Sequence, residues 1–339
     1  MGTYKGIQGY SVQSLASDPT VEDTIGQFWY NSASNVWKVS TEGSGAWATG
    51  GALNQGIDLG GYTGIQTAAM YMGGRSPLPT GGTSVIFVET YNGSSWTNTN
   101  DLTTAVYKNA GFGTTTAAIS AGGQNASNTN QNTTFSWNGT CFTSVPGTLD
   151  TARGGIHGTG TSTAGIIAGG LVPANTDLTE TYDGSTWSET GNLQTTGNNR
   201  SMIGTTTAAL CVCGVNPSPP SGLTATESWN GSSWTTVNST QSPHGEQGSC
   251  GTTSSAMIYG GMSTPGETKT LIVEAYDGTS WSETADISTA RTQPVSASQS
   301  ATSATLMAGG TPPGPSTSKS VLCEEWSDPV YAIKTVTTS

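Results

Sequence analysis

Five basic side chains recur at similar places in the sequence and could form a binding site for an anion. Each follows a repeated tryptophan or phenylalanine at a similar distance; they are Lys108, Arg153, Arg200, His244 and Arg291. Because the chain has only ten Lys and Arg residues, this recurrence indicates a shared role. Either each cation pairs with a repeated glutamate, as buried charges normally do, or together they form a site for an anion or an acidic sugar. The sequence favours pairing and keeps the anion site as the alternative.

The histidines and cysteines form no recognisable catalytic or metal-binding pattern. The only two histidines are His157 and His244, and the five cysteines are scattered along the chain. An odd number of scattered cysteines predicts free, buried thiols rather than a disulfide framework. Cys211 and Cys213 lie two apart in an apolar run, which favours packing on one face of a strand over metal binding. No catalytic, metal-ligating or cofactor-binding residue is therefore predicted.

The composition of the chain excludes several classes of protein. The 339 residues include 47 Gly, 10 Trp and 11 Tyr, but only 9% are charged. Regularly placed aromatic residues in a Gly, Thr and Ser background predict many short strands with tight turns. A net charge of -12 disfavours nucleic acid as a partner. No apolar run is long enough for a membrane-spanning helix, and the opening stretch "MGTYKGIQGYSVQSLASDPT" lacks the apolar core of a signal peptide.

Three markers repeat through the chain and define a structural unit. The first is Gly-Gly after a short apolar run, ending at Gly74, Gly123, Gly170, Gly261 and Gly310, with a sixth copy at Gly214. The second and third are aromatic residues on either side of Asn-Gly or Asp-Gly, as in "YNGSSW" and "YDGSTW". Asn-Gly and Asp-Gly are strong hairpin signals, because both residues accept positive φ, and the flanking aromatic side chains then pack across the two strands.

Each unit therefore predicts four strands in about 47 residues, a period typical of a propeller blade. The last unit lacks its fourth strand. Trp47 precedes Gly74 by the same number of positions as Trp96 precedes Gly123. The strand around Trp47 is therefore expected to pair with the strand that contains Cys323 and Trp326, which would close a six-bladed ring and remove its open edges.

The rest of the chain divides into a short arm and a short tail. Residues 44–330 are assigned to the propeller, residues 1–43 to an N-terminal arm or anchor, and residues 331–339 to a C-terminal tail. The arm contains "GQFWYNSASNVWKVS", which predicts a hairpin with its turn between Asn31 and Asn35; part of a seventh blade is the alternative. Aromatic side chains in the arm lie outside the repeat and are candidates for docking to a partner: Phe28, Trp29, Tyr30 and Trp37.

The order Gly-Gly, Tyr, Trp at this period resembles the kelch repeat, over roughly residues 45–329. The repeats are also similar to kelch-like arrays in tail-fibre and other virion proteins of marine tailed bacteriophages, in which "TAR", "AGG" and "YDGSTW" recur. Here "TAR" stands at Thr151–Arg153 and Thr289–Arg291. The stretch "IGQFWYNSASNVWKV" also looks like the short leader modules of phage structural proteins. The resemblance implies an all-β, six-bladed kelch-like propeller with a short N-terminal arm.

Two enzyme families share this kind of fold, and their site patterns are not reproduced. A galactose-oxidase-like copper site needs two His, two Tyr and a Cys joined to one Tyr, whereas His157 and His244 lie in different units. Sialidases carry an Asp box with Asp two residues before Gly, whereas Asp183 directly precedes Gly184. An enzyme of either type is therefore the least favoured alternative.

The resemblance implies a non-enzymatic virion protein in which residues 1–43 bind other virion proteins. The propeller would face outward for attachment, decoration or binding of a host glycan, without a cofactor. Multiple copies or a homo-oligomer are expected, and multiple copies add avidity to weak contacts. The alternative is a soluble carbohydrate-binding lectin or adhesin. Without a signal peptide, the expected location is the virion, after synthesis in the host cytoplasm.

Overall fold

The protein is all-β and divides into two units. The structure is a computed structural model and describes residues 13–19, 26–41, 45–76, 83–217, 220–263, 268–314, 318–328 and 332–336. All regular secondary structure in these ranges is strand. One unit spans Trp47–Trp326, and the other combines Met1–Ala46 with Ser327–Ser339. These are called the large unit and the small unit.

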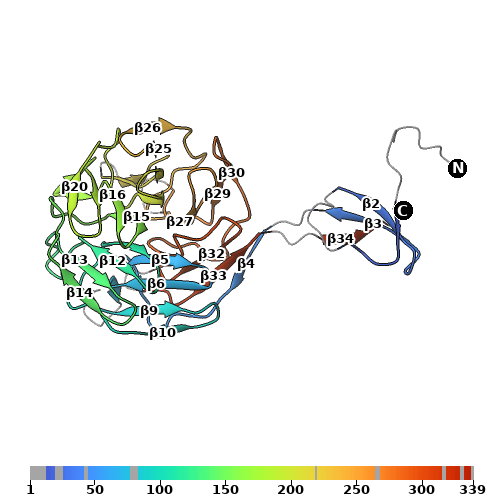
Figure 1. Cartoon of the computed structure of the whole chain (residues 1–339), viewed down its shortest axis with the longest axis horizontal. Helices are drawn as coiled ribbons and strands as arrows, with labels where there is room; N and C mark the ends of the chain where they lie inside the picture. The colour runs from blue at the N-terminus through green and yellow to red at the C-terminus, as the bar shows by residue number, and fades with distance from the viewer. Residues whose placement is uncertain are drawn as a thin grey trace. The chain divides into compact units, whose positions relative to one another are not determined.

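Within its described residues, the large unit contains six four-stranded sheets, numbered 1 to 6 along the chain. In Figure 1 the first strands β5, β15 and β27 lie near the centre of this unit, and the fourth strands β10, β14, β20, β26 and β30 lie at its rim. Sheet 1 consists of β5 (Gly61–Ile65), β6 (Ala68–Met72), β9 (Val88–Tyr91) and β10 (Trp96–Asn98). Sheet 2 consists of β11 (Ala110–Gly113), β12 (Ala118–Ala121), β13 (Thr134–Trp137) and β14 (Phe142–Val145). Sheet 3 consists of β15 (His157–Thr161), β16 (Ala164–Ala168), β19 (Thr179–Tyr182) and β20 (Trp187–Glu189).

The other three sheets repeat this plan. Sheet 4 consists of β21 (Ser201–Gly204), β22 (Ala209–Val212), β25 (Thr226–Trp229) and β26 (Trp234–Val237). Sheet 5 consists of β27 (Gly248–Gly251), β28 (Ala256–Tyr259), β29 (Val273–Tyr276) and β30 (Trp281–Glu283). Sheet 6 consists of β31 (Val295–Ser296), β32 (Ala304–Ala308), β33 (Cys323–Ser327) and β4 (Ala46–Thr49).

Loops between second and third strands form short two-stranded sheets in three places. These pairs are β7 (Arg75–Ser76) with β8 (Thr83–Ser84), β17 (Leu171–Val172) with β18 (Ala174–Asn175), and β23 (Val215–Pro217) with β24 (Pro220–Gly222). Bridges also tie these loops to the segments that enter the first strands, as between Asp58 and Arg75 and between Asn198 and Val215.

The predicted aromatic hairpins are confirmed in sheets 1 to 5. In each, the last residue of the third strand lies directly opposite the first residue of the fourth, as with Tyr182 and Trp187. The ring centroids of these pairs are 4.9 to 5.2 Å apart, a separation at which aromatic rings attract each other.

The backbone of these turns differs from the prediction that both Asn or Asp and the following Gly have positive φ. Four residues separate the paired aromatics, and only the glycine has positive φ, for example 97° at Gly184. The Asp or Asn before it acts through its side chain instead: one carboxylate oxygen of Asp183 accepts the amides of Ser185 and Thr186 at 2.8 and 2.7 Å. The residue type is therefore selected for hydrogen bonding in the turn.

The Gly-Gly markers turn the chain at the end of each second strand, as predicted. Both residues have positive φ, 70° and 100° at Gly73 and Gly74, which side chains rarely permit. The amide of the second glycine then donates to a carbonyl in the segment before the next sheet. This bond occurs six times, at 2.7 to 3.0 Å; the acceptors are Val106, Arg153, Gly197, His244, Arg291 and, from Gly310, Ile57. Each sheet is thereby tied to the next, and sheet 6 to the segment before sheet 1.

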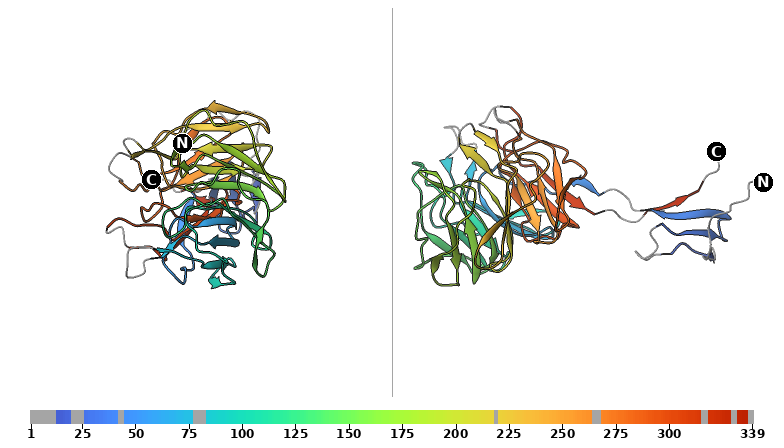
Figure 2. Two further views of the ribbon diagram at one scale, coloured as in Figure 1. Left: turned by 90° about the vertical axis from the view of Figure 1, so that its left-hand side faces the viewer. Right: turned by 90° about the horizontal axis from the view of Figure 1, so that it is seen from above.

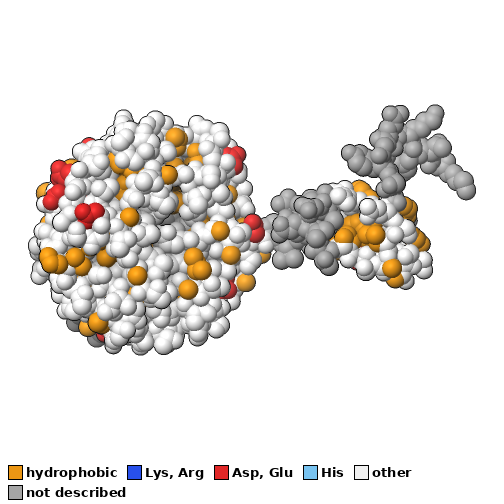
Figure 3. Space-filling view, viewed as in Figure 1, with side chains coloured by type: hydrophobic (Ala, Val, Ile, Leu, Met, Phe, Trp, Pro, Cys, Tyr) orange, Lys and Arg blue, Asp and Glu red, His pale blue; other side chains and the backbone are white. Residues whose placement is uncertain are grey.

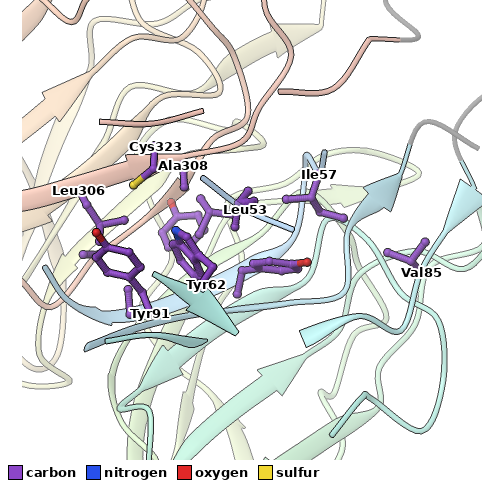
Figure 4. Close-up of a cluster of buried hydrophobic side chains, with 13 residues drawn as sticks. Leu53, Ile57, Tyr62, Val85, Tyr91, Leu306, Ala308 and Cys323 are labelled. Atoms are coloured by element: carbon purple, nitrogen blue, oxygen red, sulfur yellow. The ribbon is translucent and has the colours of Figure 1, made fainter. Parts of the chain in front are cut away.

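The strand that contains Trp47 lies beside β33, as its spacing from Gly74 predicts. The amide of Gly50 donates to the carbonyl of Cys323 at 2.9 Å, and the rings of Trp47 and Trp326 lie 5.6 Å apart. Buried clusters between sheets join the two ends of this unit in the same way. In Figure 4, Leu306, Ala308 and Cys323 lie with Leu53, Tyr62 and Tyr91 in one such cluster.

The small unit contains one four-stranded sheet, ordered β1 (Gln13–Leu15), β2 (Phe28–Asn31), β3 (Val36–Thr41) and β34 (Ala332–Thr335). The predicted hairpin is present as β2 and β3, and it belongs to this sheet rather than to a seventh blade. The prediction of a C-terminal tail at 331–339 was wrong, because β34 pairs with β3. Figure 2 shows these strands, blue and red, side by side. No local turn joins β34 to β3, so sequence spacing carries no signal of the pairing.

Candidate functional site

Four of the five predicted cations are buried and bound to glutamates. Arg153, Arg200 and His244 lie 3.0, 3.0 and 3.2 Å from Glu180, Glu227 and Glu274, and all six side chains are 0% exposed. Arg291 pairs with Glu324 in the same way. Each glutamate comes from the third strand of the sheet that follows the cation. This arrangement matches the pairing interpretation, and it leaves these four side chains without access to a solvent-borne anion.

Each glutamate also fixes the loop that carries its cation. The carboxylate of Glu180 accepts the amides of Asp150 and Thr151, and that of Glu274 accepts those of Gln241 and Ser242. Burial raises the pKa of Glu180, although the charge of Arg153 opposes this shift. Burial acts the same way on Glu274, but the hydrogen bonds from His244 and the two loop amides outweigh it and lower its pKa.

Arg200 reaches its partner from a different place in the repeat. Arg153, His244 and Arg291 lie two residues before the positive-φ residues Gly155, Glu246 and Gln293, whereas Arg200 follows Asn199. The residue two before Asn199 is Gly197, and a Cβ there would lie 3.0 Å from Cδ of Arg200. The missing side chain therefore makes room for an arginine that arrives from the neighbouring position.

Lys108, the fifth predicted cation, belongs to a set of six residues that we call the collar. The collar lies where each first strand is entered, and it consists of Leu59, Lys108, Gly155, Asn199, Glu246 and Gln293. All six have positive φ, between 49° and 66°. In five of the six steps around the collar, the backbone amide of one member donates to the carbonyl of the previous member at 2.7 to 3.4 Å, and one of these bonds runs from Leu59 to Gln293. Between Asn199 and Glu246, the side-chain amide of Asn199 donates to the Glu246 carboxylate at 3.2 Å instead.

A small hollow lies against four of the six collar residues. It is lined by Leu59, Asn199, Glu246 and Gln293 with Tyr62 and His157, and its volume of about 10 Å³ is enough for one water molecule. The hydroxyl of Tyr62 lies 2.9 Å from Nδ1 of His157, although the two residues belong to sheets 1 and 3. Burial lowers the pKa of His157 to about 4, so this ring is neutral at neutral pH.

The groups that face the hollow are not fully satisfied. The side-chain oxygen of Asn199 is buried and has no hydrogen-bond partner among the described residues. Burial raises the pKa of Glu246, with opposing effects from Gln293 and Lys108.

Next to the collar lies a second group of charges. Arg75 and Lys319 both pair with the buried Asp58, and Arg75 and Lys108 each lie 5.5 Å from the centre of the Tyr107 ring. Lys108 forms none of the ion pairs found in the described ranges. Burial lowers its pKa, because the charge of Glu246 only partly compensates for the lost water.

The four docking candidates of the arm separate onto the two faces of the small sheet. Phe28 and Trp37 are 57% and 47% exposed, and they share a face with the half-buried Tyr30. Trp29 points to the opposite face, is 2% exposed and donates its indole N–H to Asp18. Trp29 is therefore a structural residue, and its prediction as a docking residue was wrong, because neighbouring residues in a strand face opposite ways.

The five cysteines were predicted to be free and buried; four of them are buried, whereas Cys141 is only half-buried. All five cysteines are free, and burial raises the pKa of Cys211, Cys213, Cys250 and Cys323 to about 12. Within those ranges, no group of three His, Cys, Asp or Glu side chains could hold a metal ion. In the same part of the chain, no helix is long and apolar enough to cross a membrane.

Sequence reasoning identified Lys108 but missed the other residues of the collar and of the hollow. Glu246, Asn199, Tyr62 and His157 were not assigned to a site. A usable signal existed, because Lys108 and Glu246 occupy the same place in the repeat, two residues after Val106 and His244. A comparison with protein-family models finds no family that matches this chain, and a comparison with curated proteins finds no similar sequence.

Proposed function

We propose that the large unit is a six-bladed β-propeller closed by β4 and resembling kelch arrays. The six four-stranded sheets and the hydrogen bond that repeats between successive sheets support this assignment. The bond from Gly310 to Ile57 is the sixth of these and supports closure. Closure by an early strand also explains why Trp47 and Trp326 share one sheet.

We further propose that the protein is a non-enzymatic structural protein of a bacteriophage virion. In this proposal the small unit binds other virion proteins, and the propeller faces outward for attachment, decoration or binding of a host glycan. Most of the cations that could act on a substrate are engaged in structural ion pairs, which is consistent with a binding or structural role.

The exposed aromatic face of the small sheet is the observation that carries the proposal. Phe28 and Trp37 are the exposed aromatic side chains among the large hydrophobics of the described residues; the other exposed ones are Ile65, Ile86, Leu271, Val321, Leu322 and Val336. Aromatic residues are enriched at protein interfaces, where they contribute much of the binding energy. None of the buried hydrophobic clusters of the described residues includes a residue of the small sheet, and an apolar sheet face normally packs on another element.

A double substitution on this face tests the proposal. Phe28→Ser with Trp37→Ser should lower incorporation of the protein into particles by roughly tenfold or more, since such anchors contribute about 2 kcal/mol or more each. Incorporation is measured by quantitative blotting of purified particles from cells that express the variant. The propeller should retain its thermal unfolding midpoint, because neither residue belongs to the large unit.

The matched control replaces two exposed aliphatic residues of the large unit, Ile65→Ser with Leu271→Ser, which are 46% and 39% exposed. This control should incorporate normally. Normal incorporation of the Phe28 and Trp37 variant would refute the anchor, and a secreted or soluble pool that binds glycans without entering particles would favour the lectin alternative.

A further inference from the structure

Neighbouring sheets of the large unit contact each other at the turns between third and fourth strands. At three boundaries, a glycine after the fourth strand of one sheet lies against the turn of the next. A Cβ atom added to Gly147 would lie 2.0 Å from the carbonyl oxygen of Ser185, an approach that no other residue type permits. Gly51 and Gly191 approach the turns of sheets 1 and 4 in the same way.

Asn100 occupies this place at the boundary between sheets 1 and 2. It follows Trp96 by four residues, as Gly191 follows Trp187. Its side-chain amide donates to the carbonyl of Thr140, in the turn of sheet 2, at 2.7 Å. A side chain therefore separates the two backbones here, whereas at the glycines they are in direct contact.

This boundary contains a groove of about 410 Å³, a size typical of small-molecule sites. Its lining includes residues of both sheets and their turns: Thr67, Thr90, Asn92, Thr99, Thr115 and Trp137. None of the residues that line it is charged. We call it the threonine groove.

The position of Thr90 explains why the groove is open. Thr90 pairs with Met70 in sheet 1, and Met70 packs in one buried cluster with Trp137 of sheet 2. Because paired residues share a face of the sheet, the Thr90 side chain faces sheet 2. At the equivalent place between sheets 6 and 1, the longer side chain of Glu325 crosses the boundary and accepts a hydrogen bond from the hydroxyl of Tyr91. Threonine is too short to cross, which leaves room between sheets 1 and 2.

The groove offers hydrogen-bonding groups that the protein does not use. Among the described residues, no hydrogen bond involves the hydroxyl groups of four threonines that line it: Thr67, Thr90, Thr99 and Thr115. Oδ1 of Asn92 accepts the amides of Ser94 and Ser95, which leaves the side-chain N–H groups of Asn92 without a partner in the same ranges. A threonine hydroxyl both donates and accepts, and an amide N–H donates, so the groove suits a ligand with several hydroxyl groups.

The threonine groove opens at the turn end of the sheets. Strands run alternately up and down each sheet, so the turns after first and third strands share this end. The loops between second and third strands and the segments that enter the first strands share the other end, which we call the variable end because these loops differ in length. The large-unit cations outside the buried glutamate pairs lie at the variable end: Arg75, Lys108, Lys269 and Lys319.

The charge of the large unit favours a neutral ligand. This unit has seventeen Asp and Glu against seven Lys and Arg, and Figure 3 shows a face of it with acidic side chains and no Lys or Arg. Such a surface repels anions, and no cation lines the groove to offset this repulsion.

We propose that the threonine groove binds a neutral pyranose sugar of a host glycan. A pyranose ring carries hydroxyl groups along its edge and C–H groups on its two faces. The hydroxyls match the threonines and Asn92, and the C–H groups match the apolar atoms of Trp137 that line the groove. This inference rests on the proposed glycan-binding role and specifies its ligand and its site.

The experiment starts with the intact protein on an array of glycans that end in glucose, galactose, mannose, N-acetylglucosamine or sialic acid. The neutral sugar that binds most strongly is then titrated by ligand-observed NMR against the wild-type protein and its variants. Thr90→Val and Thr115→Val each remove one hydroxyl and should weaken binding roughly threefold to tenfold. Thr90→Glu copies Glu325 into the groove and should weaken binding by about tenfold or more, because the longer side chain occupies the space of the sugar.

Thr181→Val is the matched control. Thr181 occupies the place of Thr90 in sheet 3 and likewise faces a tryptophan of the next sheet, Trp229. At that boundary, however, Gly191 holds the two backbones in direct contact. The control should therefore change the affinity less than about twofold, and all the variants should unfold within a few degrees of the wild type.

Neutral-sugar binding that survives Thr90→Glu overturns the groove as the site, as does an equal loss in Thr181→Val, binding of acidic glycans alone or no binding at all. Incorporation of the wild-type protein into particles is measured separately. Absence of incorporation refutes the proposed virion role, whereas failure of the groove leaves incorporation intact, so the two failures are distinguishable.

Discussion

Sheets 2 and 3 fill the same interior position with opposite chemistry. In sheet 3, Arg153 and Glu180 form a buried ion pair, whereas the equivalent residues of sheet 2 are Val106 and Phe135. The backbone hydrogen bond is the same at both positions: the carbonyls of Val106 and Arg153 each accept a glycine amide at 2.8 Å. Backbone hydrogen bonds and aromatic hairpins therefore determine the structure of the repeat, which accommodates either an ion pair or two apolar side chains at this position.

The comparison also shows what a buried ion pair contributes here. Apolar residues of similar volume often replace such a pair without loss of stability, whereas removal of one partner is strongly destabilising. Glu180 has a second task, because it accepts the amides of Asp150 and Thr151. Phe135 offers no such acceptor. The ion pairs thus hold the loops at the variable end in place, and the strength of the core does not depend on them.

The largest effect is expected when one partner of the pair is removed. Glu180→Ala leaves Arg153 buried without a counter-ion and should lower the free energy of unfolding by about 3–5 kcal/mol. Chemical denaturation of the purified protein, followed by tryptophan fluorescence, measures this loss.

Transplanting Val106 and Phe135 into sheet 3 tests whether sheets 2 and 3 accept the same residues at these positions. The double variant Arg153→Val with Glu180→Phe should recover more than half of the stability lost in Glu180→Ala. A double variant as unstable as the single one would show that the two sheets are not equivalent frames.

A smaller effect is expected at the histidines, which repeat the contrast between a paired and an unpaired group. His244 contacts Glu274, whereas His157 is hydrogen-bonded to the neutral Tyr62. Burial lowers the pKa of His157 from 6.5 to about 4, so its neutral form is favoured in the folded state. The resulting stability is present above pH 6.5 and is lost as the pH falls towards 4, because the unfolded chain binds the proton first.

Wild-type protein should therefore lose about 2 kcal/mol more than His157→Gln between pH 7 and pH 4.5. Urea unfolding at the two pH values measures the difference. Equal losses in the two proteins would show that His157 is readily protonated in the folded state, and that its contact with Tyr62 is not a buried neutral pair.

The smallest effect is expected in the turns, where sheets 2 and 3 again differ. Asn138 and Asp183 both accept two amides of their own turns. Exchange of one for the other, Asp183→Asn, should change stability by less than about 0.5 kcal/mol at pH 7. Asp183→Ala should cost about 1 kcal/mol, as loss of a capping acceptor does. Thermal unfolding compares the two variants, and equal midpoints would contradict the role given to the side chain.

The sequence predicts the parts of the fold that depend on local residue types. Gly-Gly at positive φ, aromatic pairs across four-residue turns and the distance from Trp47 to the next Gly-Gly all have a signature within one repeat. The pairing of β34 with β3 has none, because it joins distant segments without a turn. The opposite orientations of Phe28 and Trp29 could have been predicted from the alternation of side chains along a strand.

The candidate site was less predictable, because its geometry depends on backbone conformation. Positive φ at Leu59 and Lys108 is imposed by neighbouring sheets and not by residue type. Lys108 was found because its charge is rare in this chain, whereas Glu246 was hidden among other acidic residues. The ion pair of Arg200 was predicted from approximate spacing, although Arg200 occupies a different position in the repeat from Arg153, His244 and Arg291.

The composition of sheet 6 has a consequence for synthesis. Five sheets of the large unit use consecutive segments and can form as soon as each leaves the ribosome. Sheet 6 instead combines β4, which emerges before all of them, with β33, which emerges after all of them. The strand that contains Trp47 therefore stays unpaired until the segments of the other five sheets have been synthesised. A prematurely terminated chain would expose this strand together with an incomplete sixth sheet. Cellular proteases could then recognise and degrade the incomplete chain.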